Sequence, residues 1–178
     1  MCKKMRGDLT VIGPAAIWAR YLVAGGTAIQ AGEPVHSVAT SSSGVASANT
    51  YVLAAADTPV IGTHKFGGVA NENSTNVAAG TVAEQFLNTA NPVPGVGRIR
   101  GKAETVASID TLAELALLIQ DLVLIDYNST GGTDGGELYT IKVAASADTS
   151  GCEIVGGNPA LGTLDVTLAA TAYRHDVS

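Results

Sequence analysis

Three histidines are the side chains of this chain best suited to acid–base catalysis or metal binding. His36, His64 and His175 lie in three different segments, and none has a second histidine, a cysteine or an acid nearby at metal-ligand spacing. His175 and Asp176 are adjacent, but neighbouring side chains on an extended chain point in opposite directions. No nucleophile-elbow motif supports a Ser-His-Asp triad. We therefore expect no catalytic residue, no metal site and no enzymatic activity.

The cysteines and the glycine-rich loops give no stronger signal. Cys2 and Cys152 form no CxxC motif, so neither a metal site nor a disulfide framework is indicated, and Cys152 is expected to act as a small apolar residue. Residues 95–101 superficially resemble a dinucleotide-binding loop, but the third glycine comes one residue late and the segment alternates like a strand. Residues 130–136 offer one acid, too few for calcium. We expect no cofactor.

Composition favours a protein that works through its surfaces. The chain has 178 residues, of which 15% are charged and 4% aromatic, and it contains 21 glycines. This length is enough for one compact domain with a core, and the low charge argues against an intrinsically disordered chain. Because little polar surface is available, we expect copies of the chain or a partner to cover much of it. The composition indicates a globular assembly protein.

Charge is distributed unevenly along the chain. Up to Ala103 there are eight basic residues and five acids, whereas from Glu104 onward there are eleven acids and two bases. The asymmetry either reflects two faces with different neighbours or is a chance pattern that serves solubility. On the first interpretation, residues 97–177 face outward, and binding belongs to the front half.

Nucleic-acid and membrane roles are not indicated. The basic residues at the N-terminus are too few and lack interleaved aromatics, so we expect no nucleic-acid partner. The N-terminal segment lacks the apolar run of a signal peptide, and the apolar runs are too short for a membrane span.

The first 20 residues are predicted to form an extended N-terminal arm, ahead of a single β-rich domain over residues 21–178. Gly13-Pro14 breaks any long element in this segment. Trp18 either caps one end of the core or anchors the arm on a neighbouring subunit. Lys3, Lys4, Arg6 and Trp18 are the candidate contacts with a partner protein or with a neighbouring subunit.

The rest of the chain is predicted to be mainly β, a small barrel or sandwich with one short helix. Strands are expected at 33–39, 51–56, 78–86, 98–100, 123–127, 137–144 and 163–168, with turn residues between most of them. In the last strand, Leu164, Val166 and Leu168 are predicted to point inward and Thr163, Asp165 and Thr167 outward.

One helix is predicted over residues 111–121. Thr111 and Glu114 have the spacing of a capping box. Leu112, Leu115, Ile119 and Leu122 form an apolar stripe, which is expected to pack against the core.

Several glycine and turn motifs resemble a known family. AGEPV at 31–35, ADTPVIG at 56–62, GGVAN at 67–71 and AGTV at 79–82 resemble the front half of tailed-bacteriophage capsid cement, or head decoration, proteins. The segments GRIRGKAET, IDYN, GELYTIK, ADTSG and GTLDV resemble the C-terminal half of structural proteins of marine and freshwater phages. The resemblance covers most of the chain after Tyr21 and carries no catalytic signature.

The resemblance implies a β-rich protein on the outside of an icosahedral virion, often a homotrimer, that clamps neighbouring major capsid subunits. Host cytoplasm is the implied location during assembly. Two other interpretations stay open: a different virion component, such as a head fibre or tail module, and a carbohydrate-binding β-sandwich. A fibre would show long internal repeats, which the sequence does not display. A sugar site would use exposed aromatics, which are few here.

Overall fold

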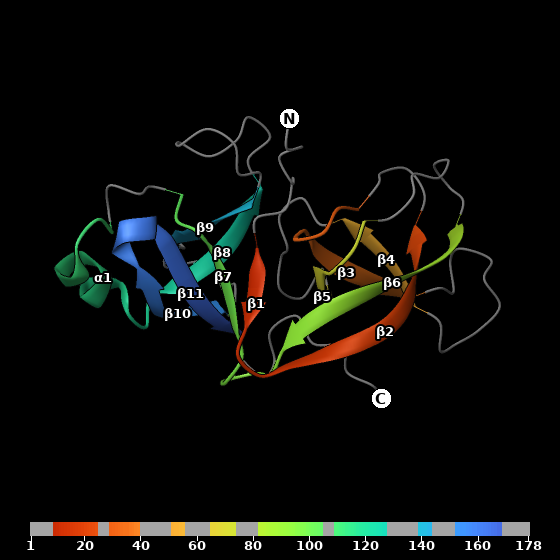
Figure 1. The fold of residues 1–178 in the computed structure, drawn as a ribbon, viewed down its shortest axis with the longest axis horizontal. Helices are drawn as coiled ribbons and strands as arrows, with labels where there is room; N and C mark the ends of the chain where they lie inside the picture. The colour runs from red at the N-terminus through yellow and green to blue at the C-terminus, as the bar shows by residue number, and fades with distance from the viewer. Residues whose placement is uncertain are drawn as a thin grey trace.

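The fold consists of two β-structures placed side by side (Figure 1). The computed structural model describes residues 9–24, 29–39, 51–55, 65–73, 82–104, 109–127, 139–143 and 152–168. These residues are mainly in strands, with one α-helix, so the predicted fold class is confirmed. The elements are β1 (Thr10–Ile12), β2 (Ala15–Ala24), β3 (Pro34–Ala39), β4 (Tyr51–Ala55), β5 (Lys65–Ala70), β6 (Val82–Pro92), β7 (Arg98–Lys102), α1 (Leu112–Leu118), β8 (Leu122–Tyr127), β9 (Tyr139–Val143), β10 (Cys152–Asn158), the 3₁₀ turn η3 (Pro159–Leu161) and β11 (Thr163–Leu168).

The first β-structure is a closed barrel. Its strands follow one another around the barrel in the order β2, β4, β3, β5, β6, and β6 pairs with β2 to close it. The β2–β4 pair is parallel, and the other pairs are antiparallel. The β2–β4 contact that completes the circle is short, with Leu22 opposite Val52 and Val23 opposite Leu53.

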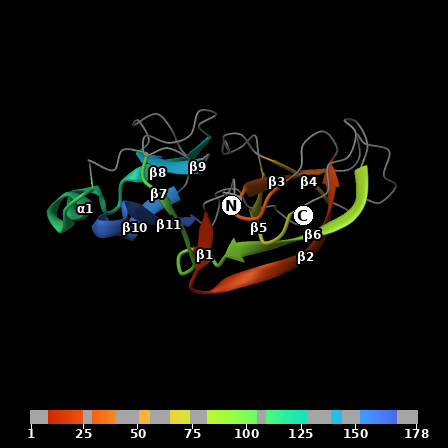
Figure 2. The ribbon, with the colours of Figure 1, turned by 45° about the horizontal axis from the view of Figure 1, so that its top comes forward.

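The second β-structure is a six-stranded sheet that curls back on itself. Its order is β1, β7, β11, β10, β8, β9. A parallel bridge between Ala103 and Ile141, with a hydrogen bond of 3.0 Å from the Glu104 amide to the Ile141 carbonyl, brings β9 back to the end of β7. Without β1, the strands around this second barrel are β7, β11, β10, β8 and β9. Figure 2 shows the two barrels from another direction.

The two barrels have the same topology. In each, the first strand pairs antiparallel with the fifth and parallel with the third, the second pairs with the third and the fourth, and the fourth pairs with the fifth. We call residues 15–92, which hold β2 to β6, repeat 1, and residues 98–168, which hold β7 to β11, repeat 2. The single β-rich domain predicted over 21–178 therefore contains a tandem duplication.

The two hairpins agree in length and register. β3 and β8 each have six residues, and β4 and β9 each have five. Val35 faces Ala55 in repeat 1, and Val123 faces Val143 at the equivalent position of repeat 2. The same number of residues separates the two strands of each hairpin. Both Val35 and Val123 are fully buried.

A shared pair of hydrogen bonds joins the second strand to the fourth in each repeat. In repeat 1 the Gly32 amide donates to the Ala70 carbonyl at 2.8 Å, and the Ala70 amide donates to the Glu33 carbonyl at 2.9 Å. In repeat 2 the Gln120 amide donates to the Ile154 carbonyl at 2.9 Å, and the Ile154 amide donates to the Asp121 carbonyl at 3.0 Å. The donors that start each pair, Gly32 and Gln120, both have positive φ, 87° and 76°.

The sequence displays no long internal repeat, but the structure shows that the chain contains two copies of the same fold. The repeats share hydrogen-bond register and, at Val35 and Val123, complete burial, while most equivalent residues differ in type. Gly32 corresponds to Gln120 and Glu33 to Asp121, for example. A barrel constrains which positions are buried and which backbone groups pair, but it leaves the identity of most side chains open.

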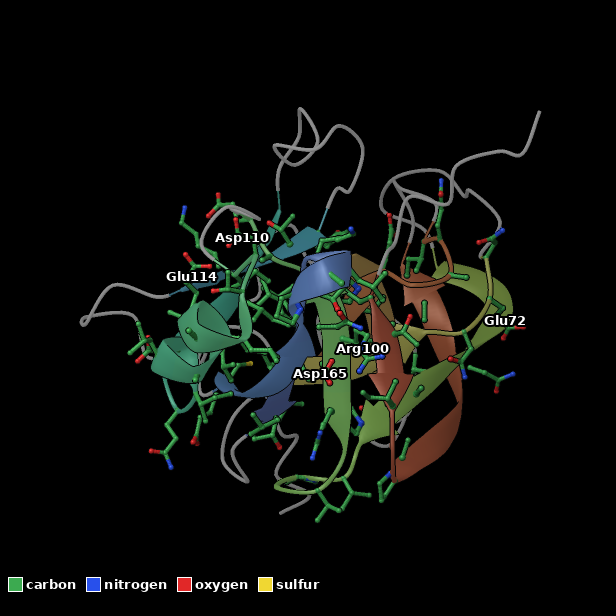
Figure 3. The ribbon with its side chains drawn as sticks, turned by 60° about the vertical axis from the view of Figure 1, so that its left-hand side comes forward. Glu72, Arg100, Asp110, Glu114 and Asp165 are labelled. Carbon is green, nitrogen blue, oxygen red and sulfur yellow. The ribbon has the colours of Figure 1, made fainter. Side chains whose placement is uncertain are left out.

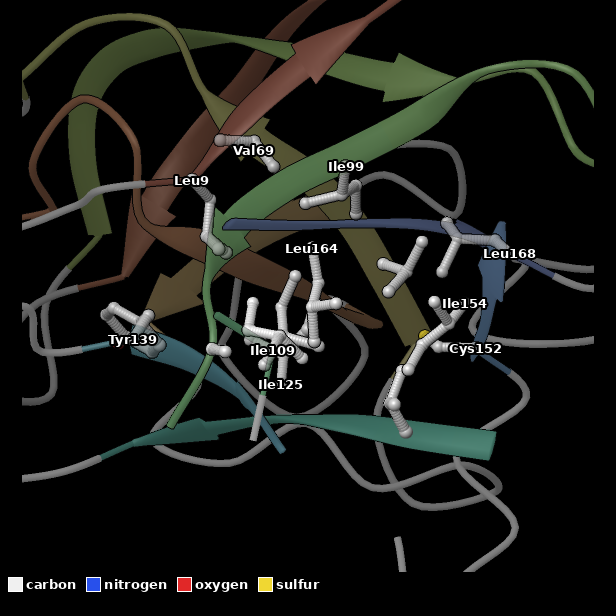
Figure 4. Packing of buried hydrophobic residues seen from close by; sticks show 14 of the residues in the cluster. Leu9, Val69, Ile99, Ile109, Ile125, Tyr139, Cys152, Ile154, Leu164 and Leu168 are labelled. Carbon is white, nitrogen blue, oxygen red and sulfur yellow. The ribbon is translucent and has the colours of Figure 1, made fainter. Parts of the chain in front are cut away.

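Among the side chains that the structure describes, a cluster of buried apolar residues lies mainly in repeat 2. Ile99, Ile125, Ile141, Ile154 and Val166 are fully or almost fully buried there (Figure 4). Leu164, Val166 and Leu168 point inward, which confirms the prediction for the last strand.

The helix begins as predicted and ends early. Thr111 is the N-cap, and both hydrogen bonds of its capping box with Glu114 are present. The helix ends at Leu118 because its C-cap, Ile119, is extended, and Gln120 then turns the chain through positive φ before β8. The predicted stripe is wrong at Leu112 and Ile119, which are 76% and 39% exposed, because the short helix packs against the core through Leu115 and Leu118 instead.

The N-terminal arm is also corrected. Residues 1–8 lie outside the described residues, but residues 10–12 form β1, which pairs with β7, and residues 15–20 form the first half of β2. Leu9 packs into the space over Gly101, where a Cβ would lie 2.7 Å from the leucine Cδ2. The predicted boundary at residue 20 therefore falls inside a strand.

β6 extends through residues whose types are common in turns. β6 begins at Val82 and continues to Pro92, so Asn91 and Pro92 belong to the strand. They stay in it because Asn91 faces Ala16 and Pro92 faces Ala15 in the ladder with β2.

The equivalence of Gly32 and Gln120 gives a reciprocal test. A non-glycine residue at positive φ is strained by roughly 1 kcal/mol, whereas glycine is not. We expect Gly32→Gln to lower the free energy of unfolding by about 1 kcal/mol and Gln120→Gly to raise it, both measured by urea denaturation. Effects of the same sign at both positions would contradict the structural equivalence.

Candidate interaction surfaces

Of the four candidate contact residues at the N-terminus, one lies within the described part of the chain. Lys3, Lys4 and Arg6 lie outside the described residues. The Trp18 backbone lies in β2 opposite Thr89, so this residue belongs to a barrel strand and not to an arm. Its role as an anchor stays a prediction.

Residues with catalytic or metal-binding potential are not gathered into a site in the described part of the chain. His64, His175 and Cys2 lie outside it, and His36 lies in β3. No group of three or more histidines, cysteines or acids that could hold a metal ion occurs among the described residues. Cys152 is fully buried in the repeat 2 core, as predicted for a small apolar residue.

Among the described residues, the shortest ion pair lies on the outer face of repeat 2, between Arg100 of β7 and Asp165 of β11 (Figure 3). Arg100 Nε and one terminal nitrogen donate to the two carboxylate oxygens at 2.6 and 2.8 Å, a bidentate geometry. The two residues face each other directly in the ladder. The carboxylate raises the pKa of Arg100, first by hydrogen bonding and then by its charge.

This pair also explains an error of the sequence interpretation. Asp165 was predicted to point outward into solvent, yet its side chain is only 5% exposed, while that of Arg100 is 40% exposed. The outward direction is correct, but Arg100 covers the carboxylate from the neighbouring strand. A buried acid without such a partner would be costly.

Three basic residues, Arg98, Arg100 and Lys102, alternate along β7 with the buried Ile99 and Gly101. Alternation places the basic residues on the outer face of the sheet. Lys102 Nζ donates to the Leu161 carbonyl at 2.6 Å, so this lysine ties β7 to η3. The basic row is thus largely engaged with its own repeat, and it is not a free anion site.

Two acids meet at the start of α1. Asp110 has a raised pKa, because its protonated form hydrogen-bonds to Glu114 and because the Glu114 charge disfavours its ionisation. Glu114 has a lowered pKa, because Asp110 and Thr111 donate to its carboxylate. Stability from Glu114 is lost as the pH falls through its lowered pKa, whereas stability from Asp110 is lost as the pH rises through its raised pKa. The contributions of Glu114 and Asp110 to the free energy of unfolding therefore change in opposite directions as the pH rises.

α1 lies at the end of repeat 2 away from repeat 1 (Figure 1), and exposed apolar side chains occur on α1, just after it and on η3. Leu112 and Leu117 of α1 are 76% and 80% exposed, and Ile119 and Leu161 are also exposed. We call these four residues the end surface. Exposed apolar patches of this kind mark interaction sites.

A second exposed apolar group lies at the joint between the repeats, where the chain passes from β1 to β2 and from β6 to β7. The Val93 amide donates to the Pro14 carbonyl at 3.0 Å, and a Cβ on Gly97 would overlap that same carbonyl. Pro14, Ala15, Ala16, Val93 and Val96 are exposed around this contact. We call these five residues the joint surface, and it carries no charged side chain.

Comparison with known proteins identifies no relative: no protein-family model matches the chain, and no curated protein is significantly similar to it. In the described part of the chain, no helix has the length and apolar character needed to cross a membrane.

The Arg100–Asp165 pair should stabilise repeat 2. Asp165→Asn removes the charge and one acceptor from a bidentate contact, and we expect the free energy of unfolding to fall by about 1–2 kcal/mol, since the arginine is partly solvated. Glu153→Gln on the neighbouring β10 is the control and should change it by less than about 0.5 kcal/mol. Equal effects of the two variants in urea denaturation would show that the pair contributes nothing.

Proposed function

We propose that this chain is a structural virion protein that binds the outer surface of a bacteriophage capsid and stabilises it by clamping neighbouring major capsid subunits. It acts without catalysis or cofactor, in contact with the major capsid protein and with other copies of itself. It is made in the host cytoplasm and resides on the virion exterior.

The tandem duplication is the observation that carries this proposal. The two repeats present the same topology and hydrogen-bond register twice within one chain. A clamp must contact at least two copies of the same subunit, and a duplicated unit offers two related surfaces in a fixed arrangement. Once one repeat is bound, binding of the other becomes intramolecular, so modest contacts suffice.

The distribution of apolar surface supports the same function. The end surface and the joint surface lie at different places along the molecule. A protein that acts at several contacts needs such separated surfaces, whereas a small-molecule enzyme gathers its functional side chains in one pocket.

The charge pattern becomes clearer when it is divided by repeat. Repeat 1 contains four acids and two bases, and repeat 2 contains ten acids and four bases. Both repeats are thus acidic, and the basic excess of the front half comes from the N-terminal Lys3, Lys4 and Arg6 and from β7. Because the β7 side chains include Arg100 and Lys102, which contact repeat 2, the first eight residues are the better candidate for an acidic capsid surface.

A head fibre or tail module is the alternative that the duplication also suits, since it repeats one unit along the chain. A carbohydrate-binding module is less well supported. Among the aromatic side chains whose surroundings are described, Tyr139 is buried in the core, and sugar stacking requires exposed rings.

The direct test uses heads of the virus that encodes this chain, prepared with its gene deleted. We expect the purified chain to co-sediment with these heads, to appear as added density on their outer surface in cryo-EM, and to raise the temperature at which they release DNA. Co-sedimentation with tails but not with heads would support the tail alternative, and binding to neither would contradict a virion role.

The N-terminal basic residues can be tested separately. Deletion of residues 1–20 would remove β1 and half of β2 and would unfold the protein, so a variant starting at Leu9 behind an initiator Met is needed. We expect it to keep its circular dichroism spectrum and melting temperature but to bind heads at least about tenfold more weakly, with a smaller salt dependence.

The matched variant with Lys3, Lys4 and Arg6 all changed to Gln keeps the length of the chain and should show the same loss. Normal binding by both variants would remove these residues from the interface.

A further inference from the structure

The two repeats differ in which strands pair with their first strand. In repeat 2, β11 pairs with one side of β7, and β1 pairs with the other side, with Thr10 opposite Arg100 and Ile12 opposite Arg98. Further along that second side, β9 arrives in parallel at Ala103. β1 therefore fills the stretch of β7 that β9 does not reach.

Register identifies the equivalent stretch of repeat 1. Thr89 faces both Ala70 and Trp18, as Val166 faces both Ile154 and Ile99, so Trp18 corresponds to Ile99. Residues 17–19 of β2 therefore correspond to the part of β7 that pairs with β1. On that side β2 pairs with β4 at Leu22 and Val23. Among the described strands, none pairs with residues 15–19 on this side, which we call the open edge.

The joint surface adjoins the open edge. Ala15 and Ala16 belong to both, and Pro14, Val93 and Val96 continue the exposed apolar surface beside them. The small alanine side chains allow a second backbone to approach closely. A free strand edge flanked by exposed apolar residues is the arrangement by which sheets extend across protein interfaces.

We propose that the open edge and the joint surface together form a two-fold interface between two copies of this chain, in which the two β2 strands pair antiparallel. Each copy presents one such edge on β2, so two copies satisfy both β2 edges without breaking any described pairing within either chain. If β1 of a second copy paired with the open edge instead, β7 of that second copy would lose its own partner strand, so no pairing would be gained. A two-fold axis also sets identical residues against each other, and this surface has no charge to repel its own copy.

The contact that we infer differs in symmetry from the trimer that the family resemblance implies. A trimer joins two different patches of each copy, whereas an isologous contact joins one patch to itself and gives a dimer. The inference does not rest on capsid binding, because it concerns the free protein in solution.

Sedimentation velocity on the full chain provides the test. We expect a concentration-dependent dimer, and we expect Ala16→Lys to weaken it by at least about 100-fold, because like charges then meet across the axis. Thr10→Lys is the matched control: Thr10 is an exposed strand residue on β1 in the other barrel's sheet, and its substitution should leave the dimer unchanged. Circular dichroism checks that both variants fold.

Thiol cross-linking keeps the inference testable if Ala16→Lys fails to fold. In a Cys2→Ser background, Ala16→Cys should give a disulfide-linked dimer under mild oxidation, and Thr10→Cys should not. A chain ending at Leu168 tests whether the C-terminal ten residues occupy the edge instead: a monomeric full chain that dimerises when truncated would overturn the proposal. Three other results would also overturn it: a trimer, a protein that is monomeric both at full length and when truncated, or a dimer whose affinity is unchanged by substitution of Ala16.

Discussion

The structure depends on a backbone constraint that acts twice: the chain must turn through positive φ just before the second strand of each barrel. At Gly32 and at Gln120 this turn aims one amide at the fourth strand, and the next carbonyl accepts from the same residue of that strand. These two bonds set where the second strand begins and, through it, the register of the hairpin that follows. Buried backbone groups must be paired, so the ladder that starts here can continue in one register only. The agreement between Val35–Ala55 and Val123–Val143 is the consequence.

The joint imposes the second constraint, because two connections cross the same small space. Gly97 has no room for a side chain beside the Pro14 carbonyl and the Val93 amide. The Gly95 amide also donates to the Leu168 carbonyl, so the last strand of repeat 2 is attached to the connection that leaves repeat 1. With Val69 of repeat 1 in the buried cluster of repeat 2, these contacts give the two barrels a shared boundary. A clamp needs such a boundary, since a flexible link would reduce the gain from binding at two points.

Local features could be predicted from the sequence, and long-range ones could not. The capping box of Thr111 and Glu114 and the alternation of Leu164, Val166 and Leu168 depend on neighbours in the chain, and both are confirmed. The burial of Asp165 depends on Arg100 in another strand, and the exposure of Leu112 depends on how a seven-residue helix meets β10. The duplication is not evident from the sequence for a related reason. Val35 matches Val123 and Tyr51 matches Tyr139, but most equivalent positions share only burial or pairing. The candidate contacts Lys3, Lys4 and Arg6 were found from charge alone.

Duplication also explains why the two repeats can serve different contacts. Both repeats keep the positive-φ turn before the second strand, but the connection that leads to it is longer in repeat 2 and contains α1, which carries the exposed Leu112 and Leu117. The first strands differ as well: β1 pairs with the side of β7 in repeat 2, whereas no described strand pairs with the equivalent stretch of β2 in repeat 1. Both repeats thus have the same barrel topology, while their strand edges and loops differ. If repeat 1 joins two copies through β2, the end surfaces of the pair lie at opposite extremes of the dimer, free to contact separate subunits of a larger shell.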